Sequence, residues 1–121
     1  MIMPITFSPS GPEGFVDTGD TLLPTATLIE GEPIGRDHVY YKYESGKLQA
    51  GIWRSAPYTE WYDSYPCDEF MYVIEGHVYI EIETDSVCYG PGSAFLVPRG
   101  FRGYWRQPVE MIKYYVIVDC D

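Results

Sequence analysis

The chain has 121 residues, and 8 Lys and Arg stand against 18 Asp and Glu, which gives a formal net charge of −10. Its 45% apolar composition supplies enough material for one packed core, and the length fits a single domain. The few scattered basic residues do not supply the clustered positive charge that nucleic acids and anionic membrane surfaces attract, so we expect neither as a partner.

No apolar run approaches the roughly 20 residues that a membrane-spanning helix needs. The N-terminal stretch has no basic residue before its short apolar run, which a secretory signal peptide would have. We therefore expect a cytoplasmic protein.

The predicted elements are short strands, because 12 Gly and 10 Pro interrupt the sequence too often for long helices. Residues 1–20, which are rich in Pro and Gly, are predicted to form an extended arm, and residues 21–121 the folded domain. In chain order, strands are predicted at residues 22–29, 38–43, 48–53, 69–74, 77–83, 87–89, 94–97, 104–106 and 111–118.

The turns between these strands follow from Gly, Pro, Asp and Ser. Glu75-Gly76 predicts a two-residue hairpin between strands 69–74 and 77–83, since Gly tolerates a positive φ. Residues 84–86 predict the next turn, and Gly90-Pro91-Gly92 ends the strand after it. Many short strands at this spacing indicate an all-β sandwich or small barrel, whose interior can hold one small ligand.

Two motifs stand out in the second half of the chain. In Glu69-Phe70-Met71-Tyr72-Val73-Ile74-Glu75-Gly76, a Glu is followed by six residues and a Gly. In Gly92-Ser93-Ala94-Phe95-Leu96-Val97-Pro98-Arg99-Gly100, a Gly and five residues precede Pro-x-Gly. Residues 45–118 are similar to the small single-domain cupins grouped with ureidoglycine aminohydrolase and the ethanolamine-utilisation cupin. The resemblance implies an all-β, cupin-type double-stranded β-helix, or jelly-roll barrel.

The sequence departs from metal-binding cupins at the positions of the ligands. Where the resemblance implies a His-x-His pair, this chain has Asp63 and Tyr65 on one spacing, or Tyr62 and Ser64 on the other. The position of the last His corresponds to Gly103, so only Glu69 remains. One carboxylate beside phenols does not make a transition-metal site, and we expect no metal and no cofactor.

Glu69 is the candidate acid or base, because strand alternation places it inside the barrel with Met71, and a carboxylate among rings has a raised pKa. The alternative is a structural Glu held by a Tyr hydroxyl or by Arg99. Five residues are expected to line the interior as ligand-binding groups, or alternatively only to fill it: Trp53, Tyr62, Tyr65, Met71 and Trp105.

The three cysteines, Cys67, Cys88 and Cys120, are widely spaced and contain no CxxC pair, so we expect reduced thiols. Cys88 and Cys120 are interpreted as small apolar strand residues. Cys67 is followed by two acidic residues, which disfavour a thiolate and therefore covalent catalysis.

Two functions remain open at this stage. The first is a metal-independent cupin that binds a small polar metabolite in the barrel, with acid/base chemistry at Glu69. The second is a non-catalytic, ligand-sensing or structural cupin with a plugged cavity. The sequence does not decide whether the protein is an enzyme. A homodimer is expected, because the many tyrosines on the predicted strands cannot all point inward.

Overall fold

The computed structural model of the chain describes residues 2–12, 15, 17–20 and 26–120. Strands are the only regular elements in these ranges: β1 Asp17–Asp20, β2 Ala26–Gly31, β3 Ile34–Lys42, β4 Leu48–Ser55, β5 Tyr58–Tyr62, β6 Asp68–Glu75, β7 Val78–Ile82, β8 Asp85–Tyr89, β9 Ala94–Val97, β10 Gly103–Gln107 and β11 Met111–Val118. The described part of the chain includes no helix that is long and apolar enough to cross a membrane.

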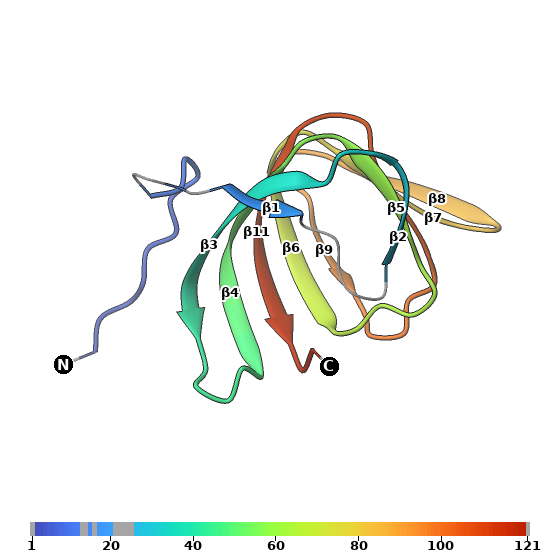
Figure 1. Cartoon of the computed structure of the whole chain (residues 1–121). Coiled ribbons are helices and arrows are strands. Elements are labelled where there is room, and N and C mark those ends of the chain that lie inside the picture. The colour runs from blue at the N-terminus through green and yellow to red at the C-terminus, as the bar shows by residue number, and fades with distance from the viewer. Residues whose placement is uncertain (1, 13–14, 16, 21–25, 121) are drawn as a thin grey trace.

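The strands form two antiparallel sheets that face one another (Figure 1). The first sheet has six strands in the order β1-β3-β4-β11-β6-β9, and the second has five in the order β2-β5-β10-β7-β8. Strands distant in sequence are neighbours in both sheets, as in the jelly roll expected from the sequence. The core lies between the sheets and is built mainly from aromatic, Val and Met side chains.

Most predicted strands are confirmed, and β9 and β11 have the predicted bounds. Residues 22–25 of the first predicted strand lie outside the described residues. Two strands were not predicted, β1 and β5. The sequence of β5 (Tyr58-Thr59-Glu60-Trp61-Tyr62) does not alternate between apolar and polar residues, yet it pairs with both β2 and β10. The predicted turn at residues 84–86 is shorter in the structure, since β8 already begins at Asp85.

The predicted hairpin at Glu75-Gly76 is wrong. Strands β6 and β7 belong to different sheets, and the chain crosses from one to the other at Gly76. Gly76 has a φ of 79°, and a Cβ there would lie only 2.2 Å from the carbonyl oxygen of Glu110. The glycine therefore allows a close approach at a crossover, which a two-residue sequence signal does not distinguish from a hairpin.

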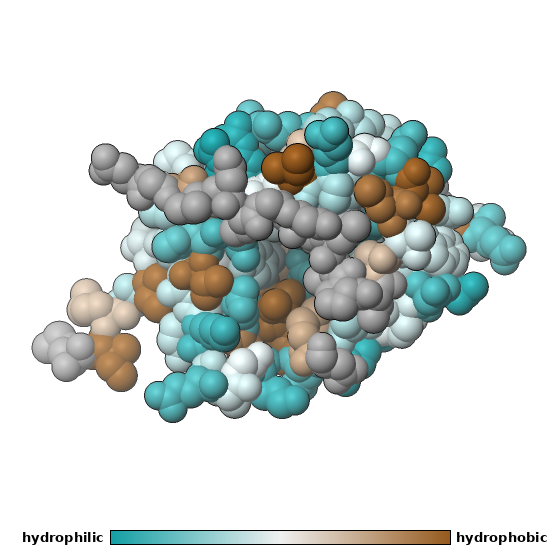
Figure 2. All heavy atoms as spheres, viewed as in Figure 1, coloured by the Kyte–Doolittle hydropathy of each residue, from teal (hydrophilic) through white to brown (hydrophobic). Residues whose placement is uncertain are grey.

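The N-terminal segment lies along the outer face of the six-stranded sheet. The ring of Phe7 stacks on Tyr40 at 4.4 Å between centroids and meets Tyr114 edge-on at 5.6 Å. The hydroxyl of Tyr114 donates to the backbone oxygen of Phe7, and the backbone N–H of Ser8 donates to the Tyr40 hydroxyl. From Phe7 towards the N-terminus, the described chain extends away from the domain (Figure 1), and Figure 2 shows apolar side chains at this end.

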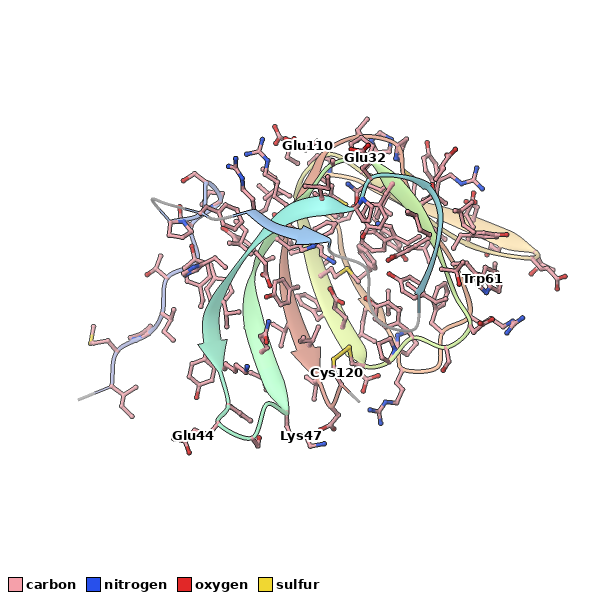
Figure 3. All side chains as sticks on the ribbon, in the orientation of Figure 1. Glu32, Glu44, Lys47, Trp61, Glu110 and Cys120 are labelled. Atoms are coloured by element: carbon pink, nitrogen blue, oxygen red, sulfur yellow. A yellow bond between two sulfur atoms is a disulfide. The ribbon has the colours of Figure 1, made fainter. Side chains whose placement is uncertain are left out.

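The expectation of three reduced thiols is wrong for two cysteines, because Cys67 and Cys120 form a disulfide (Figure 3). Cys67 immediately precedes β6 and Cys120 lies two residues after β11, and these strands pair antiparallel with Asp68 opposite Val118. The pairing brings together two cysteines that are 53 residues apart in sequence. Cys88 is a free, exposed cysteine on β8.

Candidate functional site

The interior surface of the six-stranded sheet is organised in rows across the strands. The strand register places Asp37, Trp53, Lys113 and Val73 in one row across β3, β4, β11 and β6. Since alternate residues of a strand share a face, Glu69 lies on the same inner surface as Met71 and Val73. The sheet thus brings a carboxylate of β6 and an ammonium of β11 to the same interior.

Lys113 and Glu69 form a buried ion pair. The Nζ atom of Lys113 lies 2.8 Å from Oε2 of Glu69, and each side chain is only 7% exposed. The other carboxylate oxygen, Oε1, accepts a hydrogen bond of 2.5 Å from the hydroxyl of Tyr65. Both oxygens of Glu69 are therefore engaged, and this pairing offsets part of the cost of removing the charge from water.

Two indole rings enclose the Lys113 ammonium. Its Nζ atom lies 4.4 Å from the centroid of the Trp53 ring and 4.7 Å from that of the Trp105 ring. The two rings meet edge to face, with 6.1 Å between centroids, and come from opposite sheets. An ammonium over indole faces is a favourable cation–π arrangement, and it is strongest where water is excluded.

Burial determines how the interior phenols titrate. Desolvation first, and then the Glu69 carboxylate, raise the pKa of Tyr65 well above its ordinary value. Tyr65 therefore remains a neutral hydrogen-bond donor to Glu69 throughout the physiological pH range.

A second polar network lies beside this centre. The hydroxyl of Tyr115 donates to Oδ1 of Asp37 at 2.6 Å, and Nε2 of Gln49 donates to the Tyr115 hydroxyl at 3.1 Å. Burial raises the pKa of Asp37, although the hydrogen bond from Tyr115 and the charge of Lys113 act in the opposite direction. Burial and the neighbouring Asp37 raise the pKa of Tyr115.

The residues around Glu69 do not fit a transition-metal ion. Its nearest polar neighbours are a phenol and an ammonium, and the ammonium is a donor that repels a cation. A Cβ at Gly103 would lie 2.4 Å from the backbone oxygen of Glu81, so β10 leaves no space for a ligand side chain at that position. The described residues contain no group of three His, Cys, Asp or Glu that would hold a metal.

All six residues singled out from the sequence are buried in the structure: Trp53, Tyr62, Tyr65, Glu69, Met71 and Trp105. Met71 contacts the same ammonium, with its Sδ atom 3.2 Å from Nζ of Lys113. Tyr62 packs edge-on against Tyr65 at 4.7 Å. Of the two groups considered as structural partners of Glu69, Tyr65 is the one that the structure shows.

Sequence reasoning missed Lys113, Glu60 and Asp37. Lys113 occupies the face of β11 that also carries the buried Met111 and Tyr115, so alternation along that strand would have placed it inside. Glu60 is buried on β5, opposite Trp105 of β10. No comparable signal was available for Glu60, because β5 itself was not predicted.

A groove on the outside of the domain is separate from this interior. It has a volume of about 730 Å³ and lies between the β7–β8 hairpin and the outer side of the five-stranded sheet. Its lining residues are Trp61, Glu81, Ile82, Glu83, Thr84, Asp85, Ser86 and Tyr104. None of the six candidates from the sequence is among them.

The sequence matches the model of a known protein family, in addition to having a known fold. Residues 43–115, which include Trp53, Glu69, Trp105 and Lys113, match the EutQ-like cupin domain family. The chain belongs to this family. The resemblance inferred from the two motifs is therefore confirmed. No curated protein matches the sequence.

Solved structures support the same fold. EutQ from Clostridium difficile superposes with a TM-score of 0.61 at 23% identity, over 74% of this chain and 71% of that one. A protein of unknown function from Pseudomonas syringae pv. tomato superposes with a TM-score of 0.70 at 24% sequence identity, over 84% of this chain and 44% of that one. A protein of unknown function from Rhizobium leguminosarum superposes with a TM-score of 0.62 at 17% sequence identity, over 98% of both chains. At these identities the likeness concerns the cupin fold alone.

Proposed function

We propose that this EutQ-like cupin binds a small polar metabolite inside the barrel without a metal ion, at the Glu69–Lys113 pair. The observation that carries the proposal is a buried ion pair enclosed by rings where metal-binding cupins hold a metal. Small-molecule sites are mostly apolar and aromatic, with a few placed polar groups, and this interior has that composition.

The chemistry of the pair indicates what the metabolite would present. Lys113 is a donor to an oxygen of the ligand, such as a carbonyl or carboxylate, and Glu69 is an acceptor from a hydroxyl or amine. An acid/base step would use Glu69 as the group that takes or returns a proton. Tyr65 and Lys113 would then act as positioning residues, since each holds one oxygen of that carboxylate.

The alternative, a structural or ligand-sensing cupin with a filled interior, is favoured by one specific observation. Glu69, Lys113 and Tyr65 already satisfy one another, and Trp53 and Trp105 are in mutual contact. In that case the ion pair and rings serve as a core, and no metabolite displaces them.

A ligand screen distinguishes the two functions. The purified protein is screened against a library of small hydroxy acids, amino acids and amides, with the fluorescence of the buried tryptophans and the melting temperature as readouts. Binding should raise the melting temperature of the wild type and be lost in the Lys113→Met, Glu69→Gln double variant, which removes both charges of the pair. Glu83→Gln, an exposed change on the outer surface, is the matched control. If no compound shifts the wild type, or if the double variant responds equally, the interior does not bind these metabolites.

We further propose a cytoplasmic homodimer that associates through the outer face of the six-stranded sheet. Neighbouring side chains on that face are apolar and exposed, with Phe70 of β6 at 44% and Leu96 of β9 at 54%. Exposed apolar surface of this kind commonly marks an interface, and two-fold pairing is the commonest arrangement.

A further inference from the structure

The disulfide is located at the end of the strand pair that carries the interior site. Cys67 precedes β6, the strand of Glu69, and Cys120 follows β11, the strand of Lys113. Cys67 is 1% exposed, whereas Cys120 is only partly buried near the C-terminal end. Cys120 is therefore the more exposed of the two cysteines and the expected point of attack for an incoming reagent.

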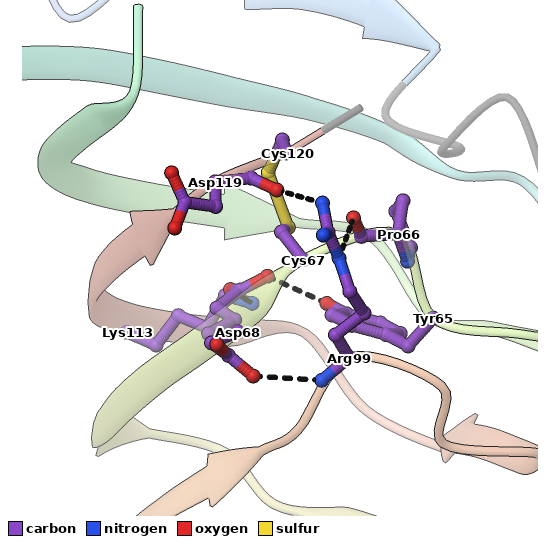
Figure 4. The surroundings of a disulfide bond; sticks show 9 residues. Tyr65, Pro66, Cys67, Asp68, Arg99, Lys113, Asp119 and Cys120 are labelled. Carbon is purple, nitrogen blue, oxygen red and sulfur yellow. Dashed lines mark hydrogen bonds and ion pairs between the residues drawn. A yellow bond between two sulfur atoms is a disulfide. The ribbon is translucent and has the colours of Figure 1, made fainter.

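Arg99 connects the two sides of this disulfide (Figure 4). Its Nε atom donates to the backbone oxygen of Pro66 at 3.3 Å, and its Nη2 atom donates to the backbone oxygen of Asp119. These two carbonyls belong to the residues immediately before Cys67 and Cys120. The guanidinium thus lies beside both half-cystines, where its positive charge stabilises a thiolate.

Acidic groups nearby act against that effect, but two of them are already engaged. The Asp68 carboxylate accepts the backbone N–H of Arg99 at 2.8 Å, and the Glu69 carboxylate is paired with Lys113. The side chain of Asp119 is also negatively charged, and its backbone oxygen accepts a hydrogen bond from the Arg99 guanidinium. Of the charged groups around the disulfide, the guanidinium is the one that contacts the backbone on both sides of the bond.

The disulfide also determines the position of the segment that holds Glu69. Tyr65 lies two residues before Cys67, Glu69 lies two residues after it, and their side chains are hydrogen-bonded to each other. At the other end, Asp119 has a φ of 54°, which is uncommon for a residue other than glycine. Its backbone N–H donates to the oxygen of Lys47. Breaking the disulfide removes the covalent restraint from both segments at once.

We propose that Cys67–Cys120 is a reversible thiol–disulfide exchange site for low-molecular-weight thiols such as glutathione, and that its reduction loosens the Tyr65–Glu69 contact. The proposal concerns a modification of the chain and does not depend on a metabolite being bound.

The exchange proceeds in two balanced steps. A glutathione thiolate attacks Sγ of Cys120, a mixed disulfide forms, and the electron pair of the broken S–S bond leaves on Cys67 as a thiolate beside Arg99. A second glutathione thiolate then attacks the glutathione sulfur, which releases Cys120 as a thiolate and glutathione disulfide. Each protein thiolate takes a proton from solvent. Two electrons pass from two glutathiones to the protein, and glutathione disulfide drives the reverse reaction.

The test uses the full chain with Cys88→Ser, which removes the exposed third thiol. The protein is equilibrated in a series of reduced and oxidised glutathione buffers, quenched with acid, alkylated in denaturant so that the buried Cys67 also reacts, and weighed by mass spectrometry. We expect zero or two alkylated cysteines, changing together across the series. Arg99→Gln should slow the reduction several-fold, and Arg99→Lys should restore part of the rate.

Hydrogen exchange measures the effect on the interior site. Reduction should speed amide exchange in residues 65–69 by about tenfold or more, so that they exchange faster than β7 and β10, which keep the protection of folded strands. Cys120→Ser should reproduce the exchange pattern of the reduced protein without any thiol reagent. The proposal is overturned if the oxidised protein carries free Cys67 and Cys120, if reduction unfolds the whole domain, or if exchange in residues 65–69 does not change.

Discussion

The Nζ atom of Lys113 lies 2.8 Å from Oε2 of Glu69, between the indole rings of Trp53 and Trp105. The two charges come from adjacent strands, β11 and β6, and meet in the interior of the barrel. Each charge makes the other tolerable there, since an unpaired charge at the same depth would be strongly unfavourable.

Removing one partner of this pair should therefore cost far more than removing both. Lys113→Met or Glu69→Gln alone is expected to lower the free energy of unfolding by about 3–5 kcal/mol. The double variant should be less destabilised than either single variant, because it leaves no unpaired charge in the interior pair. Urea unfolding of the four proteins measures this coupling, and simple additivity would show that the pair is not energetically linked.

Metal content follows from the same geometry. The ammonium of Lys113 and the missing side chain at Gly103 leave Glu69 without the neutral nitrogen ligands that transition metals prefer. We expect the purified protein to contain far less than one Fe, Mn, Ni or Zn per chain, and its melting temperature to be unchanged by added zinc. Elemental analysis that finds about one metal ion per chain after dialysis would contradict this prediction.

Asp37 gives a prediction for pH. Above its raised folded-state pKa, Asp37 is ionised in both the folded and unfolded chain, and folding carries the cost of burying the charge. As the pH falls through that pKa towards 3.8, the folded protein binds the proton first, so its stability rises relative to a chain without the carboxyl. Asp37→Asn, which keeps an acceptor for Tyr115, should therefore stabilise most at neutral pH.

The measurement is the free energy of unfolding of the wild type and Asp37→Asn between pH 7 and pH 4. The advantage of the variant should shrink as the pH falls. A constant difference across this range would mean that Asp37 does not titrate differently in the folded protein.

The disulfide should contribute strongly to stability, since it closes a separation of 53 residues in the unfolded chain. Chain entropy predicts a loss of about 4 kcal/mol when such a loop is opened. Cys120→Ser should show this loss in urea, whereas Cys88→Ser, at an exposed free cysteine, should have little effect. Equal melting temperatures for Cys120→Ser and the wild type would contradict the prediction.

The proposed homodimer can be tested on exposed side chains. Sedimentation equilibrium at micromolar concentration should give about twice the chain mass of 13.9 kDa. Leu96→Glu on the six-stranded sheet should shift the protein to monomer, since a charge there opposes burial. Val87→Glu is the matched control, because Val87 is similarly exposed, at 44%, on the other sheet. A monomeric wild type, or dissociation by both variants alike, would count against this interface.

Strand alternation predicted correctly that Glu69 and Met71 point inward, because burial alternates regularly along β6 from Asp68 to Val73. The same rule applied to β11 identifies Lys113, but a charged residue in an apolar strand is ordinarily read as exposed. Lys113 is stable in the interior because the Glu69 carboxylate lies on the neighbouring strand. That β6 and β11 are neighbours is known only from the strand order of the sheet. The disulfide is hidden for the same reason, since it depends on β6 and β11 being adjacent.

Turn and strand predictions from the local sequence were wrong or missing where the structure depends on contacts between residues far apart in the chain. Glu75-Gly76 has the composition of a hairpin, yet the approach of Gly76 to Glu110 belongs to a crossover between sheets. β5 has no alternating pattern, because its Tyr, Thr and Glu side chains are buried together against partners from β2 and β10.

The location of the positive charge on β11 has one further consequence. A counter-ion that is part of the polypeptide is present in every folded copy at unit stoichiometry, and it needs no loading step after synthesis. Chelators, metal starvation or competition from a wrong ion cannot remove it. The electrostatic balance around Glu69 is therefore inherited through a single codon, and a change at position 113 alters it in every molecule at once.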